Sequence, residues 1–294
     1  MNTWGERASR FVAGLGMGVL AILAPPAVSE PWTGDTGPSV ARADDAPDPG
    51  RDILVFVDES GSTGRQFDVY RRALLDRIVP ELKAGDRLRV APIVDDNSLV
   101  SNFMAEGTLP ARPSFDSLSD NEIDYKNEVK KEKAIDNEIR ASLMTKLKAR
   151  LAKPGKSRYT DLFGAARMAS QLFSADRRRP VVVFLSDMQE DRGRFRYRDM
   201  KWNARDLTRV EKAYGFPDLK DVCVYVIGTR SPSIEKTRKM TEFWLAYFKK
   251  TGADINASHI GSMLVNWPPG SDCGKPRALP KKQESWLQRL KKQL

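Results

Sequence analysis

Oxygen-bearing side chains follow a strongly apolar segment early in the chain. Ile53–Val57 is an uninterrupted apolar run, which predicts a strand buried on both faces of a parallel sheet. Asp58, Ser60 and Ser62 come directly after this run, at alternate positions. Such a strand would place them at the carboxyl edge of the sheet, where open α/β sheets bind their ligands. A carboxylate and two hydroxyls are hard ligands, so they predict a site for Mg²⁺ or a similar divalent ion rather than Zn²⁺ or copper.

Two later segments carry further oxygen-bearing side chains beside elements of regular structure. Thr160 lies directly before Asp161–Phe173, whose apolar residues have helical spacing. Asp187 follows a second apolar run, Val181–Leu185, with Ser186 between them. These segments add a hydroxyl and a carboxylate to the predicted site, in the chain order that such a fold requires.

The three segments together resemble the von Willebrand factor A (vWA) family and its metal-ion-dependent adhesion site (MIDAS). The resemblance extends over roughly residues 51 to 260. It implies that five residues surround the metal: Asp58, Ser60, Ser62, Thr160 and Asp187. The three hydroxyl groups would bind the ion directly, and the two carboxylates would act largely through bound water. The remaining position would be filled by a carboxylate from a partner.

The residue after Asp187 departs from the family pattern. Members of the family usually have Gly there, whereas this chain has Met188. Met enters the backbone conformations open to Gly only at a cost in energy, so we expect the loop Met188–Arg194 to have a shape of its own. The alternative to a metal site is an Asx turn after the first strand, because Asp and Ser are common turn residues.

Apolar runs alternate with helical patterns through residues 51–262, which predicts a single α/β domain. We expect a doubly wound, mostly parallel sheet flanked by helices, as in vWA and Rossmann-like folds. The predicted strands are Ile53–Val57, Leu88–Val94, Leu99–Phe103, Val181–Leu185, Val222–Ile227 and Ile255–Ile260. The predicted helices are Phe67–Pro80, residues 120–152, Asp161–Phe173 and Ile234–Lys249.

The longest predicted helix is strongly charged. Apolar residues recur in it every four positions and form one stripe: Ile135, Ile139, Leu143, Leu147 and Leu151. This stripe predicts an amphipathic helix that docks on the sheet. The earlier part, Glu122–Lys133, is so polar that we expect it to project into solvent.

The first residues have the composition of an export signal. Two Arg residues precede an apolar segment, Phe11–Ala24, which is short for a membrane span. We interpret residues 1–29 as a signal peptide, with cleavage after residue 29 or 43, and residues 30–50 as a linker. The protein is therefore expected to be exported, either to a periplasm or out of the cell. An uncleaved membrane anchor is the alternative.

The chain of 294 residues carries a formal net charge of +10, which suggests an acidic partner, a membrane surface or nucleic acid. Lys and Arg are spread along the chain and no nucleic-acid-binding motif is visible, so no nucleic acid partner is expected. Residues 263–294 form a basic tail, whose last part has apolar residues near helical spacing and could lie on an anionic membrane. A final helix docked on the domain, or a frayed tail, is the favoured interpretation.

The two cysteines, Cys223 and Cys273, would meet oxidising conditions after export. A disulfide that ties the tail to the sheet is favoured over two free thiols. Cys223 lies in a predicted strand, so an ordinary buried thiol is the alternative.

These features predict a binding module rather than an enzyme. The chain has one His, His259, so a Ser-His or Cys-His hydrolase is hard to assemble. The predicted cofactor is Mg²⁺, or alternatively Mn²⁺ or Ca²⁺, and the predicted partner is a protein that presents an Asp or Glu. One alternative is a scaffold that binds partners through its helices, with a metal that only stabilises loops. The other is a metal-dependent hydrolase built on Asp58 and Asp187.

Overall fold

The computed structural model describes residues 49–64, 66–94, 103–115, 120–153, 155, 157–173 and 177–276. The predicted signal peptide, nearly all of the linker and the last part of the tail lie outside these residues. So does most of the predicted strand Leu99–Phe103.

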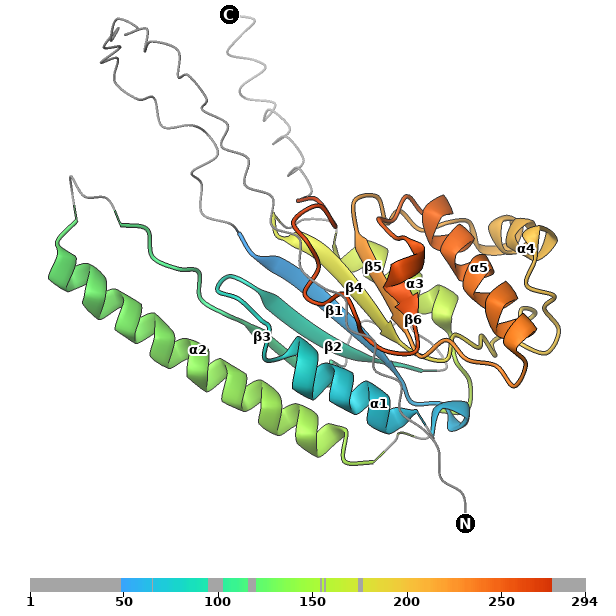
Figure 1. Cartoon of the computed structure of the whole chain (residues 1–294), viewed down its shortest axis with the longest axis horizontal. Helices are drawn as coiled ribbons and strands as arrows, with labels where there is room; N and C mark the ends of the chain where they lie inside the picture. The colour runs from blue at the N-terminus through green and yellow to red at the C-terminus, as the bar shows by residue number, and fades with distance from the viewer. Residues whose placement is uncertain are drawn as a thin grey trace, which may run out of the picture. The chain divides into compact units, whose positions relative to one another are not determined.

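A six-stranded sheet organises the described residues (Figure 1). The strands are β1 (Arg51–Asp58), β2 (Arg87–Ile93), β3 (Ala105–Thr108), β4 (Arg179–Leu185), β5 (Cys223–Ile227) and β6 (Ile260–Gly261). Their order across the sheet is β3-β2-β1-β4-β5-β6. Neighbouring strands run parallel except β2 and β3, which are antiparallel. The predicted α/β class with a mostly parallel sheet is confirmed.

Helices cover both faces of this sheet. They are α1 (Phe67–Arg72), continued by a π-helical segment (Ala73–Ile78), α2 (Glu122–Arg150), α3 (Leu162–Leu172), α4 (Ala204–Tyr214) and α5 (Ile234–Lys250). Buried side chains of α1 and α2 belong to the core on one face, and those of α3, α4 and α5 belong to the core on the other. The sheet is therefore doubly wound.

The two apolar runs identified in the sequence are the two central strands. In β1, Leu54 and Phe56 face one core, and Ile53, Val55 and Val57 face the other. Each of these side chains is fully buried. Because successive residues of a strand point to opposite faces, a strand covered on both sides needs an apolar residue at every position.

The predicted apolar stripe of the long charged helix α2 docks on the sheet only in its later part. Leu143, Leu147 and Leu151 are buried against the sheet, whereas Ile135 is 48% exposed. The earlier part of α2 is largely exposed, as expected from its polar composition. Only the later half of the helix is therefore held by apolar packing.

Three elements differ from the prediction. Neither β3 nor α4 is among the predicted strands and helices. The predicted strand Ile255–Ile260 is wrong, because Ala257–His259 forms a 3₁₀ turn, and this part of the chain pairs with β5 only at Asp254, before this range, and at Ile260–Gly261. The side chain of Asn256 accepts a hydrogen bond from the backbone of Ser258, and this local bond replaces strand pairing.

Packed structure continues beyond the domain end predicted at residue 262. Leu264, Trp267 and Cys273 are buried members of the core that also contains α1. Cys273 forms the predicted disulfide with Cys223, and their Cα atoms are 5.2 Å apart.

None of the helices within the described ranges combines the length and apolar character needed to cross a membrane.

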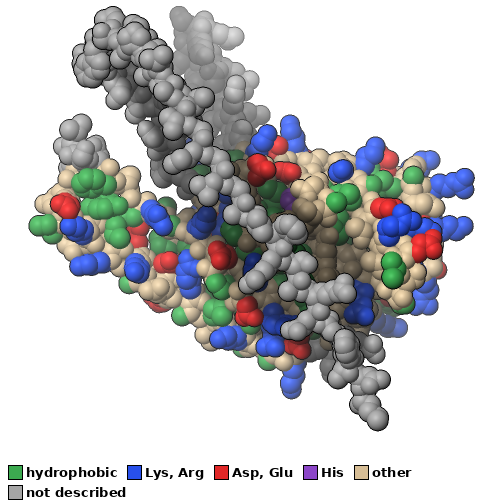
Figure 2. All heavy atoms as spheres, viewed as in Figure 1, with side chains coloured by type: hydrophobic (Ala, Val, Ile, Leu, Met, Phe, Trp, Pro, Cys, Tyr) green, Lys and Arg blue, Asp and Glu red, His purple; other side chains and the backbone are tan. Residues whose placement is uncertain are grey.

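Charged side chains are buried as pairs where the strands begin. Arg51 and Asp86 are 2% and 1% exposed, and their side chains form an ion pair at 2.5 Å. Elsewhere the charges are dispersed: Figure 2 shows Lys and Arg spread over the viewed face among Asp and Glu. No single basic block stands out on that face.

Candidate metal site

The site lies where β1 and β4 end. Asp58 is the last residue of β1, and Asp187 comes two residues after the end of β4. The two strands are parallel neighbours, and Val57 pairs with Leu185 in their register. This register alone brings the two carboxylates to the same edge of the sheet.

The carboxylate of Asp58 is completely buried and held by two hydrogen bonds. Its Oδ1 accepts from the backbone N–H of Ser60 at 2.9 Å, and its Oδ2 accepts from the hydroxyl of Ser186 at 2.6 Å. The first bond is the Asx turn that the sequence offered as an alternative to a metal site. The turn orients the carboxylate, and a carboxylate that acts on a metal through water is compatible with it.

Three hydroxyl groups complete the predicted set. The hydroxyls of Ser60 and Ser62 are 3.0 Å apart, and that of Ser62 also hydrogen-bonds to the carboxylate of Asp187. Thr160 lines the same pocket of about 290 Å³ as the two serines. All five predicted residues therefore lie together at one edge of the sheet.

The loop that carries Thr160 is fixed to both neighbouring loops. The N–H of Ser157 donates to the carbonyl of Glu59 at 3.3 Å, and the N–H of Asp191 donates to the carbonyl of Thr160 at 3.1 Å. Thr160 itself is 2% exposed. These bonds place its hydroxyl beside the β1 loop although about 100 residues separate the two in sequence.

Burial raises the pKa of both carboxyl groups. The pKa of Asp58 lies above its ordinary value because the group is removed from water. Burial, followed by the charge of Asp58, raises the pKa of Asp187 to about 7. Neither side chain has an ion-pair partner among the described residues. A divalent cation would neutralise these two carboxylates, so the donor set fits such an ion.

Met188 adopts the strained backbone conformation that the sequence suggested. Its φ is +61°, in the region that Gly enters freely, and its side chain is fully buried. The indole N–H of Trp244 donates to the carbonyl of Met188 at 3.0 Å. Core packing and this bond from α5 hold the loop in place.

Two buried glutamates that the sequence does not predict support the site. Glu190 accepts hydrogen bonds from the backbone N–H groups of Leu162 and Arg192, at 2.7 and 2.9 Å, and so joins the start of α3 to the loop after β4. Burial raises its pKa well above the ordinary value. Glu59 forms an ion pair with Arg150 at 2.7 Å. An isolated Glu has no pattern in the sequence that distinguishes such a role.

The rim of the pocket is polar and partly basic. Arg158, Gln189, Tyr197 and Arg198 line it, together with Asp191. The ammonium of Lys236 lies 3.6 Å from the centre of the Tyr197 ring. The basic loop after β4 therefore borders the site, although its other aromatic residues turn inward: Phe195 and Trp202 are buried.

Comparisons with known proteins give only distant likenesses. No family model matches the chain, and no curated protein matches it. Similar solved structures include proximal thread matrix protein 1 from the mussel byssus, at 12% identity and a TM-score of 0.36, covering 74% of this chain and 42% of that one. The same mussel protein with a zinc-occupied MIDAS motif gives the same values.

A pilus adhesin is similar to the same degree. The pilus adhesin SpaC from Lactobacillus rhamnosus GG, in its open conformation, is 10% identical with a TM-score of 0.37. The match covers 74% of this chain and 28% of the adhesin. The chain thus spans less than half of the length of each of these proteins, and likenesses this distant carry no argument about its function.

Proposed function

We propose that this protein is an exported vWA-type binding module that holds a divalent cation, Mg²⁺ or alternatively Mn²⁺ or Ca²⁺, at the edge of its sheet. Ser60, Ser62 and Thr160 would bind the ion through their hydroxyls, and Asp58 and Asp187 would neutralise it from behind bound water. When bound, the ion would supply a positive centre with a position open to an Asp or Glu of a partner protein.

The observation that carries this proposal is the pair of buried, uncompensated carboxylates. Asp58 and Asp187 are 0% and 3% exposed and lack a cationic partner within the described residues. Buried acidic groups without a partner are expensive, and proteins tolerate them mainly where they bind a ligand or a metal. Neutral hydroxyls beside them add oxygen ligands without adding negative charge, so a bound ion would keep a net attraction for an anion.

The basic rim supports an anionic partner. Arg158 and Arg198 lie at the mouth of the pocket, on two different loops. An incoming carboxylate would meet their positive field before it reached the ion, which favours association with acidic partners. The preference for an acidic group therefore has two sources that can be tested separately.

The metal is tested by titration calorimetry of the purified protein with Mg²⁺ and Mn²⁺. We expect one ion per chain, and we expect Asp58→Ala to abolish its binding. Asp68→Ala is the matched control, because Asp68 is an exposed carboxylate on α1 whose side chain pairs only with Arg71 in the described structure. Equal metal affinity in Asp58→Ala and Asp68→Ala would refute the assignment.

The partner is tested by affinity capture with the wild type, with Thr160→Ala and with chelator. Capture should be lost under the last two conditions, while folding of Thr160→Ala remains intact. Replacing the acidic residue of a captured partner should have the same effect, and the double mutant should be little weaker than either single mutant. If the partner is still captured in chelator and by Thr160→Ala, the metal does not bind the partner, and the proposed metal-dependent binding is refuted.

A scaffold function is the second candidate, and α2 favours it. Its earlier half carries exposed apolar residues, Ile123, Val129 and Ile135, and Phe115 is exposed beside it. Figure 2 shows hydrophobic side chains gathered at this end of the helix. A groove of about 970 Å³ runs between α2 and the loops after α1 and β3. Binding there would be insensitive to chelator and would be lost on substitution of Val129 by Glu.

We propose no catalytic role. His259 lines a different pocket from the five site residues, so it is not placed to act as a base there. A hydrolase would need further groups that activate water, and the two carboxylates are few for a two-metal mechanism.

Export is also part of the proposal and rests on the sequence. N-terminal sequencing of the mature protein tests it.

A further inference from the structure

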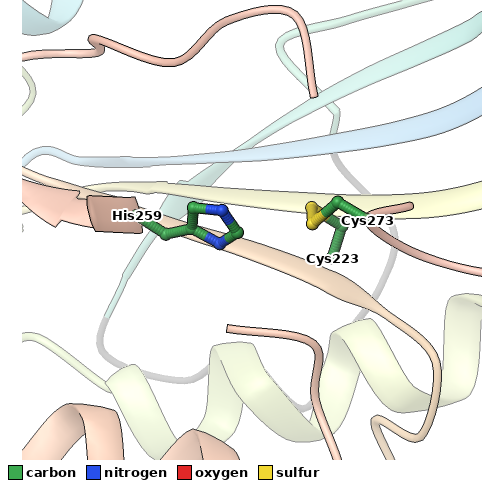
Figure 3. A group of neighbouring side chains, drawn as sticks. All are labelled: Cys223, His259 and Cys273. Atoms are coloured by element: carbon green, nitrogen blue, oxygen red, sulfur yellow. A yellow bond between two sulfur atoms is a disulfide. The ribbon is translucent and has the colours of Figure 1, made fainter. Parts of the chain in front are cut away.

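A second cluster of metal-binding side chains lies away from the proposed MIDAS. Cys223 begins β5, and Cys273 belongs to the segment that packs across the same face after β6. His259 precedes β6. The two sulfurs and one ring nitrogen of His259 lie within 4.8 Å of one another, and all three residues are buried (Figure 3).

The disulfide accounts for the cysteines and leaves the histidine partly unexplained. Figure 3 shows the imidazole extending toward the two sulfurs. The ring stacks on Tyr225 at 4.5 Å between centroids, which is a packing role. Its Nδ1, however, is buried and makes no hydrogen bond of ordinary geometry within the described structure, although the backbone of Val224 lies close enough to the ring to raise its pKa against the effect of burial. A buried ring nitrogen without a partner is costly, and a disulfide does not require one.

We propose that the reduced protein binds Zn²⁺ at Cys223, Cys273 and His259, so that the disulfide and the metal are alternative links between β5 and the segment after β6. Two thiolates and an imidazole are the ligands that Zn²⁺ prefers, in contrast to the oxygen ligands at the other site. The three residues leave one tetrahedral position. A pocket of about 370 Å³, lined by His259 and Cys273 together with Asp254 and Asp272, offers room for water there.

The geometry requires rearrangement of side chains, whereas the backbone positions already suit the site. Ligand atoms around a tetrahedral zinc lie about 3.3–3.8 Å apart, as follows from Zn–S and Zn–N bonds of about 2.3 and 2.0 Å. In the disulfide form, the ring nitrogen of His259 and the two sulfurs lie within 4.8 Å of one another. To reach the zinc geometry, the nitrogen and the sulfurs must approach one another slightly, and the two bonded sulfurs must separate. Opening the disulfide lets the sulfurs separate by side-chain rotation, while the Cα atoms stay 5.2 Å apart.

The conversion between the two states balances. A dithiol reductant donates two electrons and becomes a disulfide, the bond between Cys223 and Cys273 breaks, and each sulfur takes up a proton. Zn²⁺ then binds the two thiolates and displaces both protons. With Nδ1 as the ligand, Nε2 carries the remaining proton of the imidazole. The side chain of Asn256, 3.1 Å away, must then turn its oxygen toward that proton, which breaks the two hydrogen bonds that this oxygen accepts from Ser258.

The consequence is that the segment after β6 stays attached under either redox condition. Trp267 and Leu264 of this segment fill the core beside β5, so its release would expose apolar surface. The disulfide would hold it under oxidising conditions, and zinc would hold it when the cysteines are reduced.

The test uses the full chain reduced with a phosphine, which takes up oxygen from water as it reduces the bond, and then titrated with Co²⁺ as a spectroscopic probe. We expect one cobalt with a thiolate charge-transfer band, displaced by one equivalent of Zn²⁺. The band should persist in Asp58→Ala, because oxygen ligands at the other site cannot produce it. Absence of the band in the reduced wild type would overturn the proposal.

The histidine is tested with His259→Phe, which keeps an aromatic ring against Tyr225 and removes the nitrogens. Zinc affinity should fall about tenfold or more, as is usual when the environment of a metal is disrupted. Unchanged affinity would exclude His259 as a ligand. If this variant does not fold, alkylation of the reduced wild type decides instead: Zn²⁺ should protect both thiols, and equal alkylation with and without Zn²⁺ would refute the site.

Discussion

The pKa of Asp187 allows the proposed metal site to be tested through stability alone. In the absence of metal, the folded protein holds this carboxyl with a pKa of about 7, against 3.8 as its ordinary value. Between these two pH values the folded state retains a proton that the unfolded state has lost. Stability of the metal-free protein should therefore fall as pH rises through this range.

The size of the effect follows from the same two values. Each tenfold change in proton affinity is worth about 1.4 kcal/mol, so a pKa raised from 3.8 to about 7 lowers stability by about 4 kcal/mol once the group is ionised. Asn has nearly the same shape as Asp and never ionises. In chelator, Asp187→Asn should equal the wild type near pH 4 and exceed its stability by up to about 4 kcal/mol at pH 8.

Urea denaturation of both proteins across this pH range, in chelator and in saturating Mg²⁺, gives the difference directly. Mg²⁺ should raise the stability of the wild type and leave Asp187→Asn nearly unchanged, since a ligand stabilises only the state that binds it. Asp68→Asn serves as the control for an exposed carboxylate. A metal-free difference that stays constant from pH 4 to pH 8 would refute the reasoning.

Three further experiments test the packing of α2, the loop at Met188 and the buried ion pair. Leu147→Ala should lower the free energy of unfolding by about 2–5 kcal/mol through the cavity it leaves. Ile135→Ala, at a 48% exposed position on the same helix, should change it far less. Equal effects would contradict the packing described for α2. Met188→Gly should be about 1 kcal/mol more stable than Met188→Ala in urea denaturation, because only Gly tolerates a φ of +61° without strain. The opposite order would show that the loop relaxes in the variants. Asp86→Ala should lower the free energy of unfolding by about 3–5 kcal/mol, because it leaves Arg51 buried without its partner. Urea denaturation measures this change. A decrease below about 1 kcal/mol would mean that water reaches the guanidinium.

The central part of the fold is predictable from the sequence because of its burial. β1 and β4 are covered on both faces, so every position is apolar, and the continuous runs identify them. The edge elements lack this signal. β3 reads Ala-Glu-Gly-Thr and only Ala105 in it is buried, while α4 buries only Val210 among its apolar side chains. Their positions depend on contacts across the fold that no local pattern records.

The candidate site divides in the same way. Asp58 and Asp187 can be placed because each follows a recognisable strand, and strand register then sets their separation. The supporting groups cannot be placed. Glu190 and Glu59 act through partners 28 and 91 residues away, Leu162 and Arg150, and an isolated Glu is elsewhere a surface residue. The strain at Met188 could be inferred because Met stands where the vWA family usually has Gly. The structure shows the strained conformation directly, since the φ of Met188 is +61°.

The two halves of α2 have a consequence for the dynamics of the protein. One continuous helix carries an anchored half, with Leu143 and Leu147 buried and Arg140 bonded to the backbone of Leu82, and a half with little apolar support. Because isolated helical segments of this length are marginal in water, the earlier half should open without disturbing the rest of the domain. Amide hydrogen exchange should therefore show a gradient of protection along a single helix, from nearly none at Ile123 to the protection of the whole domain at Leu147.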